Sequence, residues 1–201
     1  MSDYRRLRIP EATAFFTVCL AEPGATLLVE EVVRLRAAVR VTMAERPFGI
    51  LAWVVLPDHL HCVWQMPEGD TDYSTRWGAI KARFTRSVKS GGTAGYNPTL
   101  RDDCGVALQP TGRVSKIGKQ EGGLWQRRFW EHHIRDEADL NAHVRYCWNN
   151  PVKHGLARTA ADWPYSSVHR DTAFGRVEEL VGPGFGAEDV DGEFGEPGRV
   201  A

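Results

Sequence analysis

The chain has 201 residues, of which 42% are hydrophobic and 10% aromatic, a composition typical of one soluble globular domain with appendages. No apolar run is long enough to span a bilayer, and the first residues lack the apolar core of a signal peptide, so we expect a cytoplasmic protein. The net charge of −1 hides an asymmetry, because residues 171–201 hold eight acidic and two basic residues. Residues 1–170 therefore carry 23 basic against 18 acidic residues, which suits a partner that carries phosphates.

The cysteines are scattered along the chain and form no Cys-x-x-Cys pair; they are Cys19, Cys62, Cys104 and Cys147. This spacing indicates neither a zinc knuckle nor a disulfide framework. We interpret them as free and mostly buried thiols.

The predicted elements alternate between strands and helices in chain order. Short apolar or alternating runs predict strands over 14–20, 50–56, 59–66 and 124–135. Apolar residues at helical spacing predict helices over 27–43, 75–88 and 137–150. We expect Ser74 and Asp136 to cap the last two helices, and Pro151 to end the last one.

The order of these elements predicts the fold class. The first six follow the pattern β-α-β-β-α-β of a ferredoxin-like split βαβ sheet. We therefore expect an α+β domain over residues 1–170, in which an antiparallel sheet has helices on one face and is followed by one more C-terminal helix. The glycine-rich stretch 90–123 is predicted to be a long loop without regular structure, and residues 171–201 a flexible acidic tail.

Two histidines on the third predicted strand form the first candidate site. His59 and His61 are two residues apart, so on a strand their side chains project from the same face. Two neighbouring imidazoles can share one cation if a third ligand lies opposite them. The alternative is that both histidines merely occupy the more polar face of an antiparallel sheet.

The last predicted helix offers that third ligand and a nucleophile. Tyr146 and Asn150 are four residues apart, so they project from one face of the helix. The amide oxygen of Asn150 is able to complete a cation site, beside which the phenol of Tyr146 is activated by the cation and a general base. The alternative is that Tyr146 only packs in the core and that Asn150 ends the helix before Pro151.

Three segments of the chain together resemble the REP-associated tyrosine transposases of the bacterial HUH single-tyrosine superfamily. They are Pro57-Asp58-His59-Leu60-His61, the segment from Trp125 to His132, and the segment from Tyr146 to Leu156 that contains Asn-Pro-Val-Lys-His-Gly. The resemblance covers about residues 5–170, with the motifs in family order. Neither the glycine-rich stretch nor the acidic tail matches a family motif.

The resemblance implies a ferredoxin-like fold and assigns roles to the candidate residues. It implies that His59 and His61 are the metal-binding histidine pair, that Tyr146 is the nucleophile and that Asn150 is the third metal ligand. The implied substrate is single-stranded DNA with a hairpin, cut through a 5′-phosphotyrosyl intermediate with Mg²⁺ or Mn²⁺ as cofactor. The implied setting is a nucleoid-associated monomer or homodimer.

Further residues are candidates for DNA contacts and for proton transfer. The expected phosphate contacts are Lys81, Arg83, Arg127, Arg128, Arg145 and Lys153, with Trp64, Trp77 or Trp130 available for base stacking where exposed. The candidates for the general base or for a group that orients Tyr146 are His143 and Glu131.

Two other functions fit the same residues. One is a domesticated protein that binds hairpin DNA but has lost cleavage. The other is a metal-dependent hydrolase that uses a bound water, with Tyr146 in a structural role.

Overall fold

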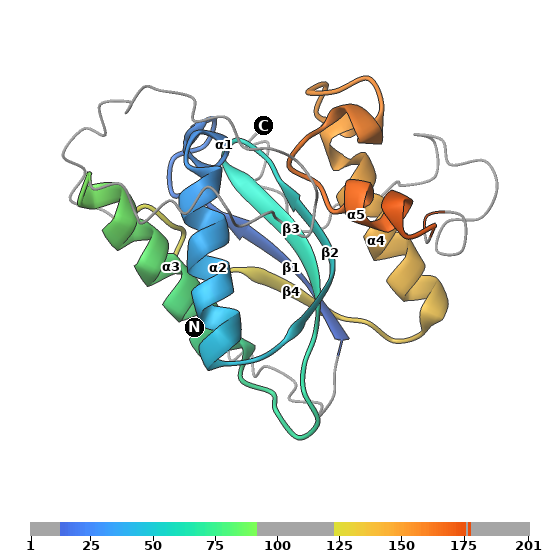
Figure 1. Ribbon diagram of the computed structural model, residues 1–201, viewed down its shortest axis with the longest axis horizontal. Helices are drawn as coiled ribbons and strands as arrows, with labels where there is room; N and C mark the ends of the chain where they lie inside the picture. Colours follow the sequence, from blue (N-terminus) through green and yellow to red (C-terminus); the bar gives the residue numbers. More distant parts are fainter. Residues whose placement is uncertain (1–12, 92–122, 176, 178–201) are drawn as a thin grey trace, which may run out of the picture.

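The core of the molecule is a four-stranded antiparallel sheet, seen in a computed structural model that describes residues 13–91, 123–175 and 177 (Figure 1). The strands are β1 (Thr13–Cys19), β2 (Gly49–Val55), β3 (His59–Gln65) and β4 (Trp130–His133), in the spatial order β2-β3-β1-β4. A tight turn joins β2 to β3 as an antiparallel hairpin, and β1 pairs with both β3 and β4. This is the ferredoxin-like strand order, so the predicted fold class is confirmed.

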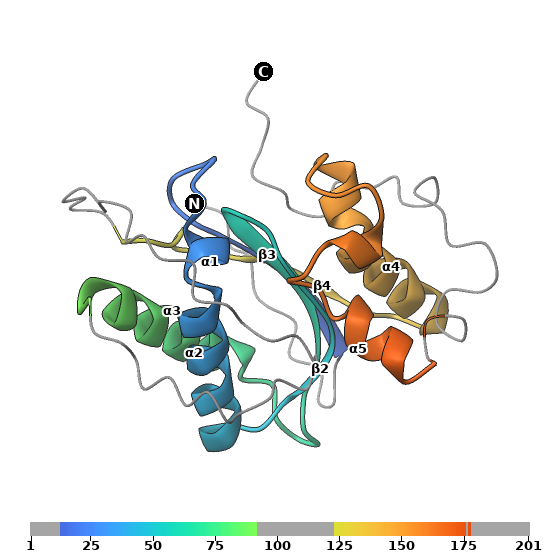
Figure 2. The same cartoon turned by 45° about the horizontal axis from the view of Figure 1, so that its top comes forward.

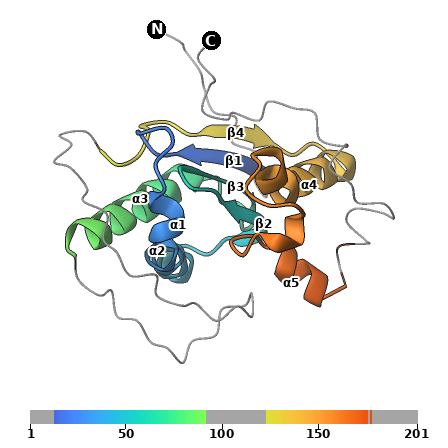
Figure 3. The same ribbon diagram turned by 90° about the horizontal axis from the view of Figure 1, so that it is seen from above.

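Helices cover both faces of this sheet. The helices α1 (Leu27–Glu30), α2 (Val32–Glu45) and α3 (Tyr73–Lys89) lie on one face, and α4 (Glu137–Lys153) and α5 (Val168–Ala173) lie on the other (Figures 2 and 3). A short 3₁₀ helix, Ala160–Asp162, connects α4 to α5. The expected helices on one face are therefore α1 to α3, and the additional C-terminal helix closes the opposite face.

The two faces of the sheet form separate cores. Leu60 and Cys62 of β3 belong to an apolar cluster with Trp64, Trp77 and Phe84, beneath α2 and α3. The second cluster lies beneath α4 and includes Phe15, Val63, Tyr146 and Trp148. Because side chains alternate along a strand, β3 contributes to both clusters, and its two histidines point toward α4.

Two predicted helix features differ from the structure, and a third is confirmed. The single helix expected over 27–43 is interrupted at Glu31, and the backbone N–H of Leu28 in α1 donates to the carbonyl of Pro57 in the turn between β2 and β3. The cap of α3 is Asp72 rather than Ser74, since its carboxylate accepts from the N–H of Thr75. The cap at Asp136 is confirmed, since its carboxylate accepts from the N–H of Asp139.

Pro151 does not end α4, which continues to Lys153. The turn after it holds because the N–H of His154 donates to the carbonyl of Asn150 and the N–H of Leu156 to that of Pro151. The helix stops where Gly155 adopts a φ of 67°, a left-handed conformation that favours glycine. This extra turn places Lys153 and His154 next to the candidate site.

The predicted strand over 124–135 is shorter in the structure. Trp125 forms an isolated bridge with Leu20, and regular pairing with β1 resumes only at Trp130. Between these points the chain leaves the sheet, with Arg127 and Arg128 exposed and Phe129 packed against the first core. The alternating sequence thus predicted a strand correctly, but the regular strand is shorter than predicted.

The predicted appendages lie largely outside the described residues. Residues 92–122 of the glycine-rich stretch and residues 178–201 of the tail are not described, and α5 extends past the domain boundary set at residue 170. Cys19, Cys62 and Cys147 are buried and form no disulfide, while Cys104 is not described. Within the described ranges, no helix combines the length and the apolar character needed to cross a membrane.

Candidate active site

The two histidines of β3 share one buried environment. His59 and His61 are 3% and 0% exposed, and their ring centroids are 5.0 Å apart. Nδ1 of His59 donates to the Asp58 carboxylate at 2.7 Å, and Nδ1 of His61 lies 2.8 Å from the Thr17 hydroxyl. Among the described residues, no group hydrogen-bonds to the buried Nε2 atom of either ring.

This pattern is the one expected of metal-binding histidines. A ligating histidine normally donates one ring N–H to a carboxylate or other acceptor, which fixes the tautomer and leaves the second nitrogen for the ion. Asp58 is itself fixed, because its second oxygen accepts from the N–H of Gly24 at 2.6 Å. Burial raises the pKa of Asp58, but hydrogen bonds from His59 and Gly24 outweigh it, so that this pKa lies below its usual range.

His61 is held as a neutral imidazole. Its burial lowers the pKa well below the ordinary value of 6.5, and the nearby charges of His59, His154 and Lys153 lower it further. The neutral ring is the form that donates a lone pair to a metal. Burial and the neighbouring charges therefore favour the neutral imidazole of His61, the form able to bind a metal ion.

Helix α4 places Tyr146 directly against this pair. The ring centroid of Tyr146 is 5.1 Å from that of His61 and 5.8 Å from that of Phe15, which itself stacks on His61 at 5.6 Å. The ammonium group of Lys153 lies 5.2 Å from the centre of the Tyr146 ring. The phenol of Tyr146, the imidazole pair and the ammonium group of Lys153 thus lie together on one face of the sheet.

Contacts of the residues that follow Tyr146 on α4 hold this arrangement. The buried indole of Trp148 donates to the hydroxyl of Ser167 at 3.1 Å, and Cys147 is fully buried in the same cluster. Asn150, 1% exposed, follows Tyr146 by one helical turn. Two imidazole nitrogens and an amide oxygen form a donor set that suits a divalent ion such as Mg²⁺ or Mn²⁺.

The expected phosphate contacts do not form one patch. Arg145 and Lys153 belong to α4, while Lys81 and Arg83 belong to α3 on the opposite face of the sheet. Arg83 binds Glu45 and the hydroxyl of Thr42, so its guanidinium stabilises the contact between α2 and α3.

The remaining expected contacts lie near the segment that precedes β4. Lys81 donates to the carbonyl of Gln126 at 2.9 Å, and Arg127 and Arg128 are exposed there. Of the three tryptophans considered for stacking, Trp64 and Trp77 are buried in the first core and Trp130 is 36% exposed.

The two candidates for proton transfer lie on different faces of the sheet. Glu131 pairs with Phe16, a residue of the first core, so it points toward α3 and away from Tyr146. His143 lies on α4, three residues before Tyr146, and its ring packs against Phe15 at 4.9 Å. The structure therefore disfavours Glu131, and the reason is the strand register.

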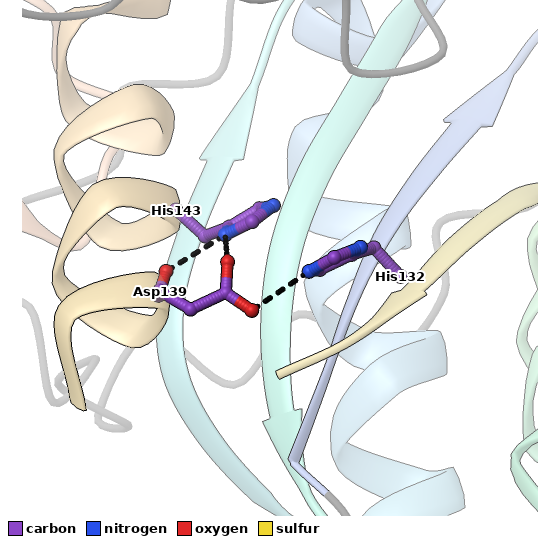
Figure 4. Close-up of side chains that lie close together, drawn as sticks. All are labelled: His132, Asp139 and His143. Carbon is purple, nitrogen blue, oxygen red and sulfur yellow. Dashed lines mark hydrogen bonds and ion pairs between the residues drawn. The ribbon is translucent and has the colours of Figure 1, made fainter. Parts of the chain in front are cut away.

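A neighbouring cluster was not anticipated from the sequence. His132 of β4 and Asp139 and His143 of α4 place ligand-type atoms within 4.8 Å of one another (Figure 4). Asp139 and His143 have the i, i+4 spacing of neighbours on a helix, so their contact was predictable from the sequence. The contribution of His132 required the register of β4 with β1.

The fold and the site define an α+β protein with a ferredoxin-like sheet and a candidate metal and tyrosine centre beneath its last long helix. No family model matches the chain. It is 42% identical over 175 residues, 87% of both chains, to the REP-associated tyrosine transposase of Escherichia coli (strain K12). It is 38% identical over 171 residues, 85% of this chain and 88% of the relative, to a putative REP-associated tyrosine transposase of Haemophilus influenzae (strain ATCC 51907 / DSM 11121 / KW20 / Rd).

A solved structure agrees with these sequence relatives. The structure of a REP-associated tyrosine transposase bound to a REP hairpin superimposes with a TM-score of 0.74 at 39% sequence identity, and the match covers 98% of each chain. The chain therefore belongs to the family of REP-associated tyrosine transposases.

Proposed function

We propose that this chain cuts and rejoins single-stranded DNA at REP-type hairpins, with Tyr146 as the nucleophile. The observation that carries the proposal is the packing of the Tyr146 ring against His61, in a pair of histidines whose Nδ1 atoms are already bonded. The hairpin-bound structure of a related transposase supports hairpin DNA as the substrate class. A cytoplasmic, nucleoid-associated monomer or homodimer fits such a substrate.

The proposed reaction transfers a DNA phosphoryl group from a 3′ oxygen to the phenol of Tyr146. The phenol oxygen of Tyr146 bonds to the scissile phosphorus while the bond from phosphorus to the 3′ oxygen breaks. The phenol gives up its proton to a base, and the departing 3′ oxygen gains one. The tyrosyl ester keeps the bond energy, so the reverse attack by a 3′-hydroxyl rejoins a strand without a nucleotide cofactor.

The residues around Tyr146 have distinct proposed tasks. His59, His61 and Asn150 would hold Mg²⁺ or Mn²⁺, which when bound withdraws charge from a nonbridging oxygen of the phosphate. Asp58 and Thr17 orient the two imidazoles through their Nδ1 atoms. The basic side chains proposed to contact phosphates are Lys81, Arg83, Arg127, Arg128, Arg145 and Lys153, with Arg145 and Lys153 on the helix that carries the nucleophile.

A denaturing gel tests this proposal. Labelled hairpin DNA is incubated with the protein and Mn²⁺, and a protein–DNA adduct that survives denaturation is expected. Tyr146→Phe should abolish the adduct while it retains hairpin binding. Tyr73→Phe is the matched control, because Tyr73 is a buried tyrosine on the opposite face of the sheet.

The same assay separates the two alternative functions. Binding of the hairpin without any cleavage by the unmodified protein would indicate a domesticated DNA-binding protein. Cleavage that persists in Tyr146→Phe would indicate a hydrolase that uses a metal-bound water. Either result would reject Tyr146 as the nucleophile.

A further inference from the structure

Asp139 is the centre of a hydrogen-bond network at the start of α4. One carboxylate oxygen accepts from Nε2 of His132 at 2.9 Å and from the backbone N–H and Nε of Arg135 at 3.0 and 3.1 Å. The other oxygen lies 3.1 Å from Nδ1 of His143 (Figure 4). The backbone of Asp139 is fixed too, because its N–H donates to the capping carboxylate of Asp136 at 2.8 Å.

This network determines which nitrogen of His143 carries a proton. Nδ1 faces two acceptors, the Asp139 carboxylate and, at 2.8 Å, the backbone carbonyl of the same residue. Nδ1 therefore carries a hydrogen, and Nε2 of the neutral ring carries the lone pair.

The same contacts argue against a second metal site in this cluster. A bound ion would require the lone pair of His143 Nδ1, which is protonated in this arrangement. Arg135 also places a positive charge on the Asp139 oxygen that such an ion would need. The three side chains are explained as a hydrogen-bonded network.

The charges in the network leave His143 able to accept a proton. Burial is the largest single influence on the pKa of Asp139 and raises it, but the hydrogen bonds from His132 and Arg135 together outweigh burial and lower the pKa, so the carboxylate stays ionised. Burial is also the main reason that the pKa of His143 lies below its ordinary value, with a further contribution from His132. A neutral imidazole beside a fixed carboxylate is the arrangement of an oriented general base.

His143 lies close to the nucleophile as well as to Asp139. It is 2% exposed and precedes Tyr146 by three residues, so the two side chains are neighbours on the surface of α4. Both rings pack against Phe15, at 4.9 and 5.8 Å between centroids, and His132 stacks on His143 at 4.5 Å. Among the described residues, the titratable groups in contact with His143 include His132 from β4 and Asp139 from α4, and Arg135 binds the same carboxylate. Tyr146 lies one turn further along α4, and β1 contributes the apolar Phe15.

We propose that Asp139 is a positioning residue that holds His143 as the proton acceptor for Tyr146. This inference rests on the proposed function of Tyr146. The phenol proton passes to Nε2 of His143 as the phenol oxygen bonds to phosphorus and the bond from phosphorus to the 3′ oxygen breaks, and the departing 3′ oxygen takes a proton from water. In the rejoining step the attacking 3′-hydroxyl returns its proton to the solvent as its oxygen bonds to phosphorus, and the imidazolium returns its proton to the departing phenol oxygen. Asp139 stabilises the imidazolium in between.

The test compares single-turnover rates of adduct formation between about pH 5.5 and pH 9 for the unmodified protein, Asp139→Asn and His143→Gln. At pH 7 we expect Asp139→Asn to slow adduct formation about 10- to 100-fold and His143→Gln about 100-fold or more, each with hairpin affinity within about twofold. Loss of the carboxylate should also move the rise of the rate with pH to lower pH, because imidazolium is no longer stabilised. In His143→Gln the rate should keep rising with pH without a plateau.

Two controls separate positioning from a structural role. Asp171→Asn removes a buried carboxylate that pairs with Arg170 on α5, so it should lower the melting temperature without moving the pH profile. Asp139→Glu keeps the charge and should restore part of the rate. If Asp139→Asn does not fold, Asp139→Glu reports on the carboxylate, with a slower rate and a shifted pH profile expected, and His143→Gln reports on the proton acceptor.

The outcomes that would overturn the proposal are distinct. Rates within about twofold of the unmodified protein in both variants, or slower rates with an unshifted pH profile, would reject the role of Asp139 and His143 while Tyr146 stays the nucleophile. Absence of any adduct with the unmodified protein would reject this inference together with the proposed function.

Discussion

The two faces of β3 bury side chains of opposite character. Toward α2 and α3, the strand contributes Leu60, Cys62 and Trp64 to an apolar core. Toward α4, the same strand contributes His59 and His61, whose Nε2 atoms are buried without a hydrogen-bond partner among the described residues. The first face is built from large apolar side chains whose burial stabilises the fold, whereas the second face adds imidazole groups that are able to bind a metal ion.

This difference indicates a division of labour within one sheet. The α2 and α3 face is where substitutions should change the stability of the fold. The α4 face is where they should change chemistry. Matched substitutions on the two faces are therefore the way to test the comparison.

The largest expected effect on stability comes from Trp77, which is 1% exposed and stacks on Trp64 at 4.2 Å. Trp77→Ala should lower the free energy of unfolding by about 3–5 kcal/mol, because it removes a large buried ring and leaves a cavity. Urea unfolding measures this loss. The rate of adduct formation per folded molecule should stay within about twofold of the unmodified protein, and a larger fall would show that the two faces are not independent.

The next largest effect concerns the histidine pair. His61→Ala should slow adduct formation at least about 100-fold, because it removes a proposed metal ligand, while the free energy of unfolding without metal changes by less than about 2 kcal/mol. The matched control is His133→Ala, since His133 pairs with Ala14 and points toward the first core. Equal rates of adduct formation for both variants would contradict the proposed metal-binding role of His61.

A smaller effect is expected from the hydroxyl that orients His61. Thr17→Val keeps the shape of the side chain but removes the group 2.8 Å from Nδ1 of His61. We expect a 10- to 100-fold loss of Mn²⁺ affinity, as for other residues that orient metal ligands. Titration calorimetry with Mn²⁺ alone measures this change, and unaltered affinity would contradict the proposed metal site.

Part of the candidate site was predictable from the sequence alone. The His-x-His spacing on a strand and the i, i+4 spacing of Tyr146 and Asn150 are local patterns, so both were readable before the structure. The face on which Glu131 lies and the contact between His132 and Asp139 depend on the register of β4 with β1, which no local pattern determines. The predicted end of α4 at Pro151 was wrong, because the helix ends only before Gly155, which adopts a left-handed conformation.

The smallest effect concerns pH and the ion pair of Asp70 with Arg76 beside the first core. A hydrogen bond from Arg76 is the main reason that the pKa of Asp70 lies below its ordinary value of 3.8. A lowered pKa in the folded state stabilises the fold above the unfolded value, and this stabilisation disappears as the pH falls through the folded value. Asp70→Asn should therefore cost less than about 1 kcal/mol at pH 7, because the carboxylate is partly exposed and screened.

Thermal unfolding at two pH values measures this contribution. The difference between Asp70→Asn and the unmodified protein should be present at neutral pH and should disappear as the pH falls through the lowered pKa of Asp70. A difference that persists in strong acid would show that the substitution acts through packing rather than through charge.

Mass spectrometry of the covalent adduct tests the central claim most directly. The protein is incubated with hairpin DNA and Mn²⁺, digested with a nuclease and a protease, and searched for the peptide that carries a nucleotide. We expect a 5′-phosphate ester on Tyr146. A nucleotide attached to any other residue, or cleaved DNA with no modified peptide, would contradict it.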